Sequence, residues 1–161
     1  MLADNTLIND IKAIIAGARE QAVRAVNHER TLMYWHIGQR IFEEEQRGQE
    51  RADYGTYLVQ MIAERLQPEF GSGFSKRQIS YCRQLYRTFP IVHALRAQLS
   101  WTQYKMLLSI DNEDKREFYI AESVKNNWSS RQLERQINSQ LYERLLLSND
   151  KESVLAVARN E

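Results

Sequence analysis

The sequence predicts an all-α protein with six or seven helices in one compact helical domain, and three observations support this fold class. Apolar residues recur at intervals of three and four over most of the 161 residues, which is the period of an amphipathic helix. Alternating apolar and polar residues are scarce, so no strand pair is indicated. An apolar residue, Ser, two residues and Gln follow one another in three places, and each copy is typical of a helix start.

The first helix is expected at the N-terminal end of the chain. Apolar residues keep to one face over residues 7–26, and the pattern continues over residues 34–42. Asn27 is the point at which this long helix could divide into two.

A loop and a second helix follow. The stretch from Glu43 to Asp53 is polar and contains Gly48, which predicts a helix end and a loop. Asp53 is a suitable N-cap for a helix with apolar residues at positions 58–66. The sequence FGSG at Phe70–Gly73 is the strongest turn signal in the chain.

The three Ser motifs predict helices that begin after Ser75, Ser100 and Ser129. A Ser hydroxyl can accept a hydrogen bond from an unpaired backbone N–H of the first turn, and the Gln three residues later can bond back to the Ser backbone. The flanking apolar pairs sit where a hydrophobic staple needs them: Phe74/Ile79, Leu99/Tyr104 and Trp128/Leu133.

Two further expectations concern the C-terminal part. Asp111 is predicted to cap a helix over residues 112–124. The last helix, from Ser129, places Leu133, Ile137, Leu141 and Leu145 at spacings of four, so this row could dock within the domain or form a dimer seam. We therefore expect a helical domain over residues 1–147 and a polar tail over residues 148–161, which would begin a linker.

Composition limits the class of protein. A single cysteine, Cys82, excludes an intrachain disulfide framework and a multi-cysteine metal site, and its place on an apolar face predicts a core residue. No apolar run approaches the roughly 20 residues that cross a bilayer, and Asp4 and Asp10 interrupt the N-terminal region. These features predict a soluble, cytoplasmic protein without a membrane partner.

Charge is unevenly distributed although the net charge is only +1. Residues 1–70 hold 8 basic and 11 acidic residues, whereas residues 71–147 hold 12 and 7. No acid occurs between Glu69 and Asp111, which is a candidate electrostatic footprint for nucleic acid. Cations near capped helix starts could hold phosphates, and the candidate binding residues are Lys76, Arg77, Arg83, Arg87, Arg131 and Arg135. A solvated cationic face is the alternative interpretation.

Catalytic and cofactor chemistry is not indicated. Glu113-Asp114-Lys115 resembles a fragment of a nuclease site, but acids in the first turn of a helix also suit its dipole. His28, His36 and His93 lack metal-ligand spacing, so no metal or other cofactor is expected. Most aromatic residues fit core positions. Tyr81 and Trp101 are the exceptions that could stack on bases.

Five segments carry a resemblance to a known family. They are YWHIG (34–38), YG (54–55), GFSKRQISYCRQLYRTFP (73–90), LSWTQYKMLLSI (99–110) and REFYIAESVKNNWSSRQLERQINSQLYERL (116–145). Over about residues 5–147 the chain resembles the N-terminal domain of the bacterial YhcG-like family of uncharacterised proteins. Thr102-Gln103 stand where that family often has Ser-His, and Cys82 stands where it often has Met.

The resemblance implies a nuclease-associated function. Full-length family members follow this domain with a PD-(D/E)XK-type nuclease domain, and the helical part is thought to be a helix–turn–helix-like or winged-helix-like module that binds DNA or a partner. No catalytic residues belong to this part, so this chain is not expected to be an enzyme. The nuclease domain would lie beyond residue 161. On this expectation the sequence is either a domain excised from a longer protein or the product of a truncated gene.

Two hypotheses therefore stand. The first is a non-catalytic nucleic-acid-binding module that serves a nuclease, with DNA as the expected ligand and RNA as the alternative. The second is a protein-interaction or homodimerisation module that uses the last helix.

Overall fold

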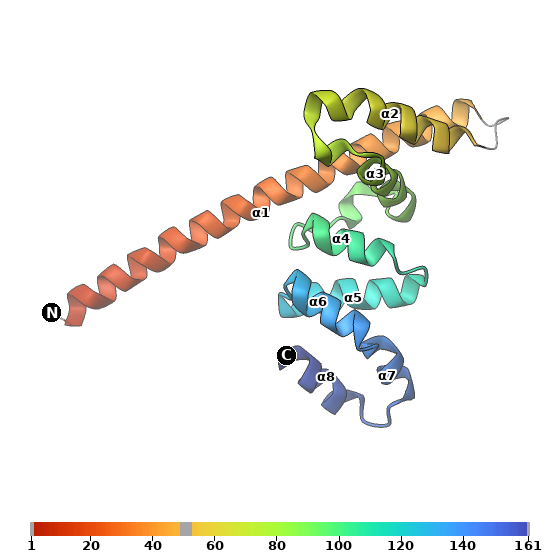
Figure 1. Cartoon of the computed structure of the whole chain (residues 1–161). Helices are drawn as coiled ribbons and strands as arrows, with labels where there is room; N and C mark the ends of the chain where they lie inside the picture. The colour runs from red at the N-terminus through yellow and green to blue at the C-terminus, as the bar shows by residue number, and fades with distance from the viewer. Residues whose placement is uncertain (1, 49–52, 161) are drawn as a thin grey trace.

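A computed structural model of the chain describes residues 2–48 and 53–160 (Figure 1). The helices stack in one column, with α2 at the top of Figure 1 and α7 and α8 at the bottom. The described residues form eight α-helices, two short 3-10 helices and no strand: α1 (Leu2–Arg47), α2 (Tyr54–Phe70), η1 (Ser72–Phe74), α3 (Lys76–Thr88), η2 (Val92–Ala94), α4 (Trp101–Leu108), α5 (Glu113–Asn126), α6 (Ser130–Asn138), α7 (Leu141–Leu147) and α8 (Lys151–Asn160).

The all-α prediction is confirmed, and the predicted number of six or seven helices is wrong. A winged-helix arrangement includes a β-hairpin, and residues 2–48 and 53–160 contain none. The helix–turn–helix-like portion stays a prediction. No helix within the described ranges is long and apolar enough to cross a membrane.

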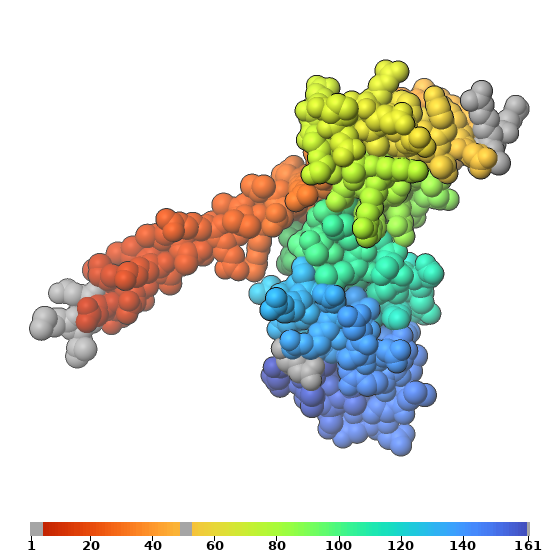
Figure 2. All heavy atoms as spheres, viewed as in Figure 1, coloured from red at the N-terminus to blue at the C-terminus, as the bar shows by residue number. Residues whose placement is uncertain are grey.

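Helix α1 is continuous over 46 residues and does not divide at Asn27. Proline is absent from it, so no ring interrupts the backbone hydrogen bonds, and the Thr31 hydroxyl also donates to the Asn27 carbonyl (3.1 Å). It also runs beyond the expected end at Phe42 as far as Arg47. The C-terminal half packs on the other helices, whereas the N-terminal half stands away from them (Figure 2).

The crossing of α1 over α3 is the closest helix approach at the centre of the fold. A Cβ atom on Gly38 would overlap with the Cys82 carbonyl oxygen of α3, so glycine is required at this crossing. Cys82 is fully buried there, as predicted, and burial raises the pKa of its thiol to about 12. Nearby, the Trp35 indole N–H donates to the Phe89 carbonyl (2.6 Å), which fixes the end of α3 against α1.

Arg83 joins the same two helices by charge. Its Nη2 atom donates to Oε2 of Glu45 (3.0 Å), and its Nε atom donates to Oε1 of the same carboxylate. This two-point pair raises the pKa of Arg83 and holds α3 to the end of α1. A Cβ atom on Gly55, at the start of α2, would overlap with the Arg83 guanidinium. Two glycines of the family-like segments thus make room for α3.

Two of the predicted caps differ in the structure. Asn112, and not Asp111, caps α5, because its side-chain oxygen accepts the Lys115 backbone N–H (2.9 Å). Asp53 precedes α2 as predicted, but its side chain makes no capping hydrogen bond.

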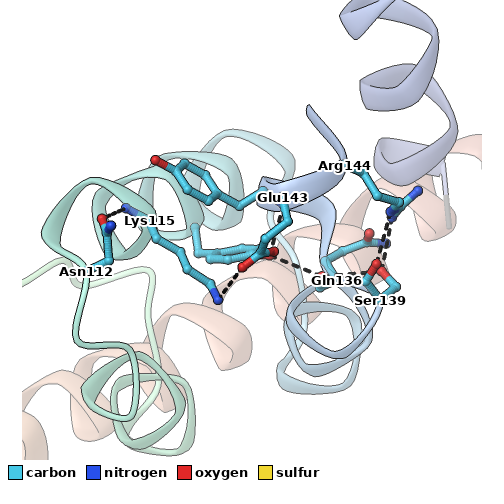
Figure 3. A network of polar contacts seen from close by, with 8 residues as sticks. Asn112, Lys115, Gln136, Ser139, Glu143 and Arg144 are labelled. Atoms are coloured by element: carbon cyan, nitrogen blue, oxygen red, sulfur yellow. Dashed lines mark hydrogen bonds and ion pairs between the residues drawn. The ribbon is translucent and has the colours of Figure 1, made fainter. Parts of the chain in front are cut away.

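The expected single last helix is two helices, α6 and α7. The chain turns at Gln140, which has a left-handed backbone (φ 58°). The Tyr119 hydroxyl of α5 occupies the break: it donates to the Gln136 carbonyl (3.2 Å) and accepts the Tyr142 N–H (3.2 Å). Arg144 donates to both the carbonyl and the hydroxyl of Ser139, on the other side of the turn (Figure 3).

The row of apolar residues that was considered as a dimer seam lies on both sides of this break. Leu133 and Leu141 are fully buried and Leu145 is 9% exposed, all in the main core of the domain. Ile137 is partly buried against the same core. The row docks within the domain, which is the first of the two uses expected for it, and a homodimer stays a prediction.

The expected polar tail is largely helical. Helix α8 covers residues 151–160 and buries Ala158 in the core. Arg159 makes a two-point ion pair with Glu122 of α5 (2.9 and 3.1 Å), and this guanidinium lowers the pKa of the carboxyl. Residues 154–158 are all apolar, and Val154 and Leu155 pack against the core beside Ala158, so this segment docks as a helix and is not a polar tail. The domain boundary at residue 147 stays a prediction.

Candidate nucleic-acid interface

The three Ser motifs cap three helices, as predicted. The hydroxyls of Ser75, Ser100 and Ser129 each accept the backbone N–H of the Gln three residues later. In α4 and α6 that Gln also bonds back to the Ser backbone and completes a capping box.

At the start of α3 the Gln has a different partner. The Gln78 side-chain oxygen accepts the Trp101 indole N–H (3.1 Å), which ties the first turn of α3 to the first turn of α4. The motif is the same in sequence, but here its second half joins two helices.

A second pair of hydrogen bonds ties α4 to α6. The Ser100 and Ser130 hydroxyl oxygens lie 3.3 Å apart. Gln103 donates from its buried side-chain amide to the Trp128 carbonyl (2.8 Å). The N-terminal ends of α3, α4 and α6 therefore form a row, which we call the cap row, and α4 and α6 begin on the same side in Figure 1.

Helix N-terminal ends have an electrostatic property that matters here. Their first N–H groups lack helical partners and the helix dipole is positive there, so anions are favoured. Lys76 and Arg77 lie in the first turn of α3, where a cation opposes the dipole. Placing two cations there costs a little stability, and an anion bound nearby would offset this cost.

A shallow hollow lies between α3 and α4 beside the cap row. Arg77, Tyr81 and Lys105 line it together with Thr102. The Arg77 guanidinium lies 5.7 Å from the centre of the Tyr81 ring, and the Lys105 ammonium lies 6.0 Å from it. Two cations thus flank one aromatic ring, an arrangement that can hold a phosphate beside a stacked base.

The structure separates the predicted site residues on α3. Lys76 and Arg77 are exposed at its N-terminal end, and no carboxylate of the described residues forms an ion pair with either. Arg87 is exposed at the opposite end, about 16 Å along the helix from Lys76. Arg83 lies between them and is neutralised by Glu45.

On α6, Arg131 and Arg135 occupy exposed positions one turn apart. Arg131 follows Ser130 directly and so lies at the cap row. Arg135 lies one turn further along α6 and so is further from the row. The structure therefore brings Lys76, Arg77 and Arg131 to linked helix ends and leaves Arg83 and Arg87 apart.

The aromatic predictions divide in the same way. Trp101 is 4% exposed and its ring lies tilted against that of Tyr34, with the ring centres 4.6 Å apart, so its predicted role in stacking on bases is wrong. Tyr81 is half-buried and borders the hollow. Lys105 was part of the acid-free interval but not of the predicted site. No local sequence signal singles it out, because its setting depends on Tyr81 of α3 lying across the hollow.

The Glu113-Asp114-Lys115 triplet has a structural setting. Lys115 forms an ion pair with Glu143 of α7 (2.6 Å, Figure 3), and this ammonium lowers the pKa of Glu143. Glu113 and Asp114 are exposed in the first turn of α5. Over the described ranges, no three His, Cys, Asp or Glu side chains gather in a group that could hold a metal ion.

Comparison with known proteins assigns the family. Residues 10–144 match the family described as the DUF1016 N-terminal domain. The chain belongs to this family. It is also 34% identical to a protein of Escherichia coli (strain K12) named "Putative nuclease YhcG", over 88% of this chain and 46% of that protein. The chain therefore spans about half the length of this relative. No solved structure matches the chain.

Proposed function

We propose that this DUF1016 N-terminal domain is a non-catalytic DNA-binding module of a nuclease of the PD-(D/E)XK type. It contacts the phosphates of duplex DNA through the cap row and the hollow beside it. The phosphate ligands are Lys76, Arg77, Lys105 and Arg131, and Tyr81 packs against the nucleotide that they hold. Cleavage belongs to another part of the full-length protein.

One observation carries this proposal: three helix N-terminal ends are hydrogen-bonded into a row, and unpaired cations lie at them. A phosphate there gains both the helix dipole and a charged side chain. Such contacts position a protein on the DNA backbone and carry no sequence information. Arg83 is not a ligand in this proposal, because Glu45 already neutralises it.

The name of the similar protein supports the context but not the activity of this chain. That protein is called a nuclease, and the present chain matches less than half of it. A module that raises the local concentration of DNA at a nuclease site would be consistent with both facts.

A fluorescence-anisotropy titration of labelled duplex DNA at about 50 mM and 200 mM salt tests the proposal. Phosphate contacts release counterions, so four contacts predict a loss of affinity of about 100-fold or more between these two conditions. A parallel titration with duplex RNA of the same sequence shows which nucleic acid is preferred.

The double variant Arg77→Gln/Lys105→Gln identifies the surface. It should weaken binding at low salt and reduce the salt slope by about 2, since two phosphate contacts are lost. Arg87→Gln is the control for the loss of an exposed cation as such, because it removes one positive charge from the far end of α3. Absence of binding at 50 mM salt, or equal losses in both variants, would refute the cap row as the binding surface.

A further inference from the structure

The N-terminal half of α1 presents an apolar face that nothing in the described structure covers. Every side chain from Asn5 to Val26 is exposed. Ile8, Ile11 and Ile15 are between 43% and 49% exposed. Figures 1 and 2 both show this half of the helix standing away from the stacked helices. Large aliphatic side chains on a free helix indicate a partner surface.

The apolar face follows a heptad pattern. Six residues at spacings of 3, 4, 3, 4 and 3 occupy the two core positions of each heptad, and none of them is charged: Ile8, Ile11, Ile15, Ala18, Ala22 and Ala25. Three full heptads run from Ile8 to His28, which is the length from which a coiled coil can be argued. The first three core residues are Ile and the last three are Ala.

This order of sizes selects the partner and its direction. In an antiparallel pair of identical helices, Ile8 faces Ala25, Ile11 faces Ala22 and Ile15 faces Ala18 of the second copy. Each layer then holds one large and one small residue, so the helix spacing is uniform. A parallel pair would put Ile on Ile at one end and Ala on Ala at the other, with uneven spacing. We propose that residues 8–28 of α1 form an antiparallel two-stranded coiled coil with a second copy of this chain.

The direction of the face permits this pairing. Ile11 and Gly38 are 27 residues apart, which is about 7.5 turns, so the heptad face points away from the face that crosses α3. Met33 lies four residues after Glu29, and its side chain is also exposed on the side of α1 that faces away from α3. The second helix can therefore run past the domain without meeting it, and the two domains lie at opposite ends of the pair.

The size of the seam sets its strength. Twenty-one residues give a seam about 32 Å long and about 10 Å wide, or about 300 Å² in projection for each copy. A standard stable interface buries about 800 Å² per partner. We therefore expect a dimer that dissociates in the micromolar range and not an obligate one.

Charges at the edge give the dimer a salt dependence of its own. Lys12 and Arg19 occupy the same edge position of successive heptads, and an antiparallel pairing brings Lys12 of one copy near Arg19 of the other. Salt screens this repulsion. A higher salt concentration should therefore leave dimerisation unchanged or strengthen it. DNA binding has the opposite dependence.

Sedimentation equilibrium of the full chain from about 1 to 500 µM tests the proposal. We expect a monomer–dimer equilibrium that Ile11→Asp weakens by about 100-fold or more, because each dimer would bury two carboxylates at its seam. Val23→Asp is the matched control. Val23 is 60% exposed on the same helix but lies off the heptad face, so this variant should dimerise as strongly as the parent. Thermal unfolding followed by circular dichroism should show that the packed domain of both variants unfolds at the same temperature as that of the parent.

Oxidative cross-linking fixes the direction. Ile8→Cys and Ala25→Cys should each fail to cross-link alone and should cross-link when mixed, because residue 8 faces residue 25 of the other copy. Cys82 is buried and does not interfere. Cross-linking of each variant with itself would overturn the antiparallel arrangement. A chain that is monomeric up to 500 µM, or an Ile11→Asp variant as dimeric as the parent, would overturn the seam itself.

Discussion

The two halves of α1 have the same periodicity and opposite surroundings. From Thr31 onward the helix buries Tyr34 and Trp35 and crosses α3 at Gly38. From Asn5 to Val26 every residue is exposed except Gly17, which is partly buried. The buried half carries aromatic side chains with polar tips that find partners, and the exposed half carries only Ile, Leu, Val and Ala on its apolar face. The comparison teaches that helical periodicity predicts a face to be covered but not what covers it.

The largest expected effect comes from a glycine substitution in the packed half of α1. Gly38→Ala should destabilise the fold by about 3 kcal/mol or more, because the new methyl group meets the Cys82 backbone carbonyl, which cannot move aside easily. Urea unfolding followed by tryptophan fluorescence measures it. A loss below about 1 kcal/mol would show that the crossing is looser than the structure has it.

The next effect concerns pH and the buried thiol. Burial raises the pKa of Cys82 from 9.0 to about 12, so the folded protein keeps this proton after the unfolded chain has lost it. Its contribution to stability is therefore present below about pH 9 and is lost between about pH 9 and 12, by up to about 1.4 kcal/mol per pH unit. Buried Tyr104, whose pKa is raised to about 12, acts in the same direction above pH 10.

Thiol reactivity at pH 8 checks the same point without unfolding curves. Native Cys82 should resist an aromatic disulfide reagent, whereas a cysteine introduced at Ile8 in the exposed half should react at once. Equal rates at both positions would contradict the burial of Cys82.

A smaller effect separates stability from binding on α3. Arg83→Gln removes the ion pair that holds α3 to Glu45, and we expect a loss of about 1–3 kcal/mol in the free energy of unfolding. DNA affinity at low salt should stay within about twofold of the parent. If the variant unfolds like the parent but loses DNA binding, Arg83 contacts DNA and belongs to the binding surface.

The smallest effect is expected in the exposed half. Gly17→Ala adds a methyl group into open space on a free helix, so it should stabilise the helix by up to about 1 kcal/mol and leave the core unchanged. Helical content by circular dichroism should rise slightly. A loss of helicity would mean that Gly17 contacts something that the isolated chain lacks.

Local chemistry was predictable from sequence, and partnerships between distant residues were not. The caps at Ser75, Ser100 and Ser129 depend on atoms within one turn, and all three were predicted. The break at Gln140 depends on the Tyr119 hydroxyl from another helix, so the row of leucines suggested one helix where there are two.

The candidate site divides along the same line. Lys76, Arg77 and Arg131 were identified because they adjoin capped helix starts. The neutralisation of Arg83 could not be predicted, because Glu45 lies 38 positions earlier in the chain. Lys105 was missed because its value depends on Tyr81 lying across the hollow from a different helix.

The length of α1 makes it a lever arm. Asn5, near the free end of the helix, lies 33 residues before Gly38, so this tip is about 50 Å from the pivot at the α1–α3 crossing. A tilt of about 10° at Gly38 would move that tip by about 9 Å. The packing around Gly38 therefore sets the direction of the N-terminal half of α1. A small change in that packing would move any partner bound near the tip by a much larger distance.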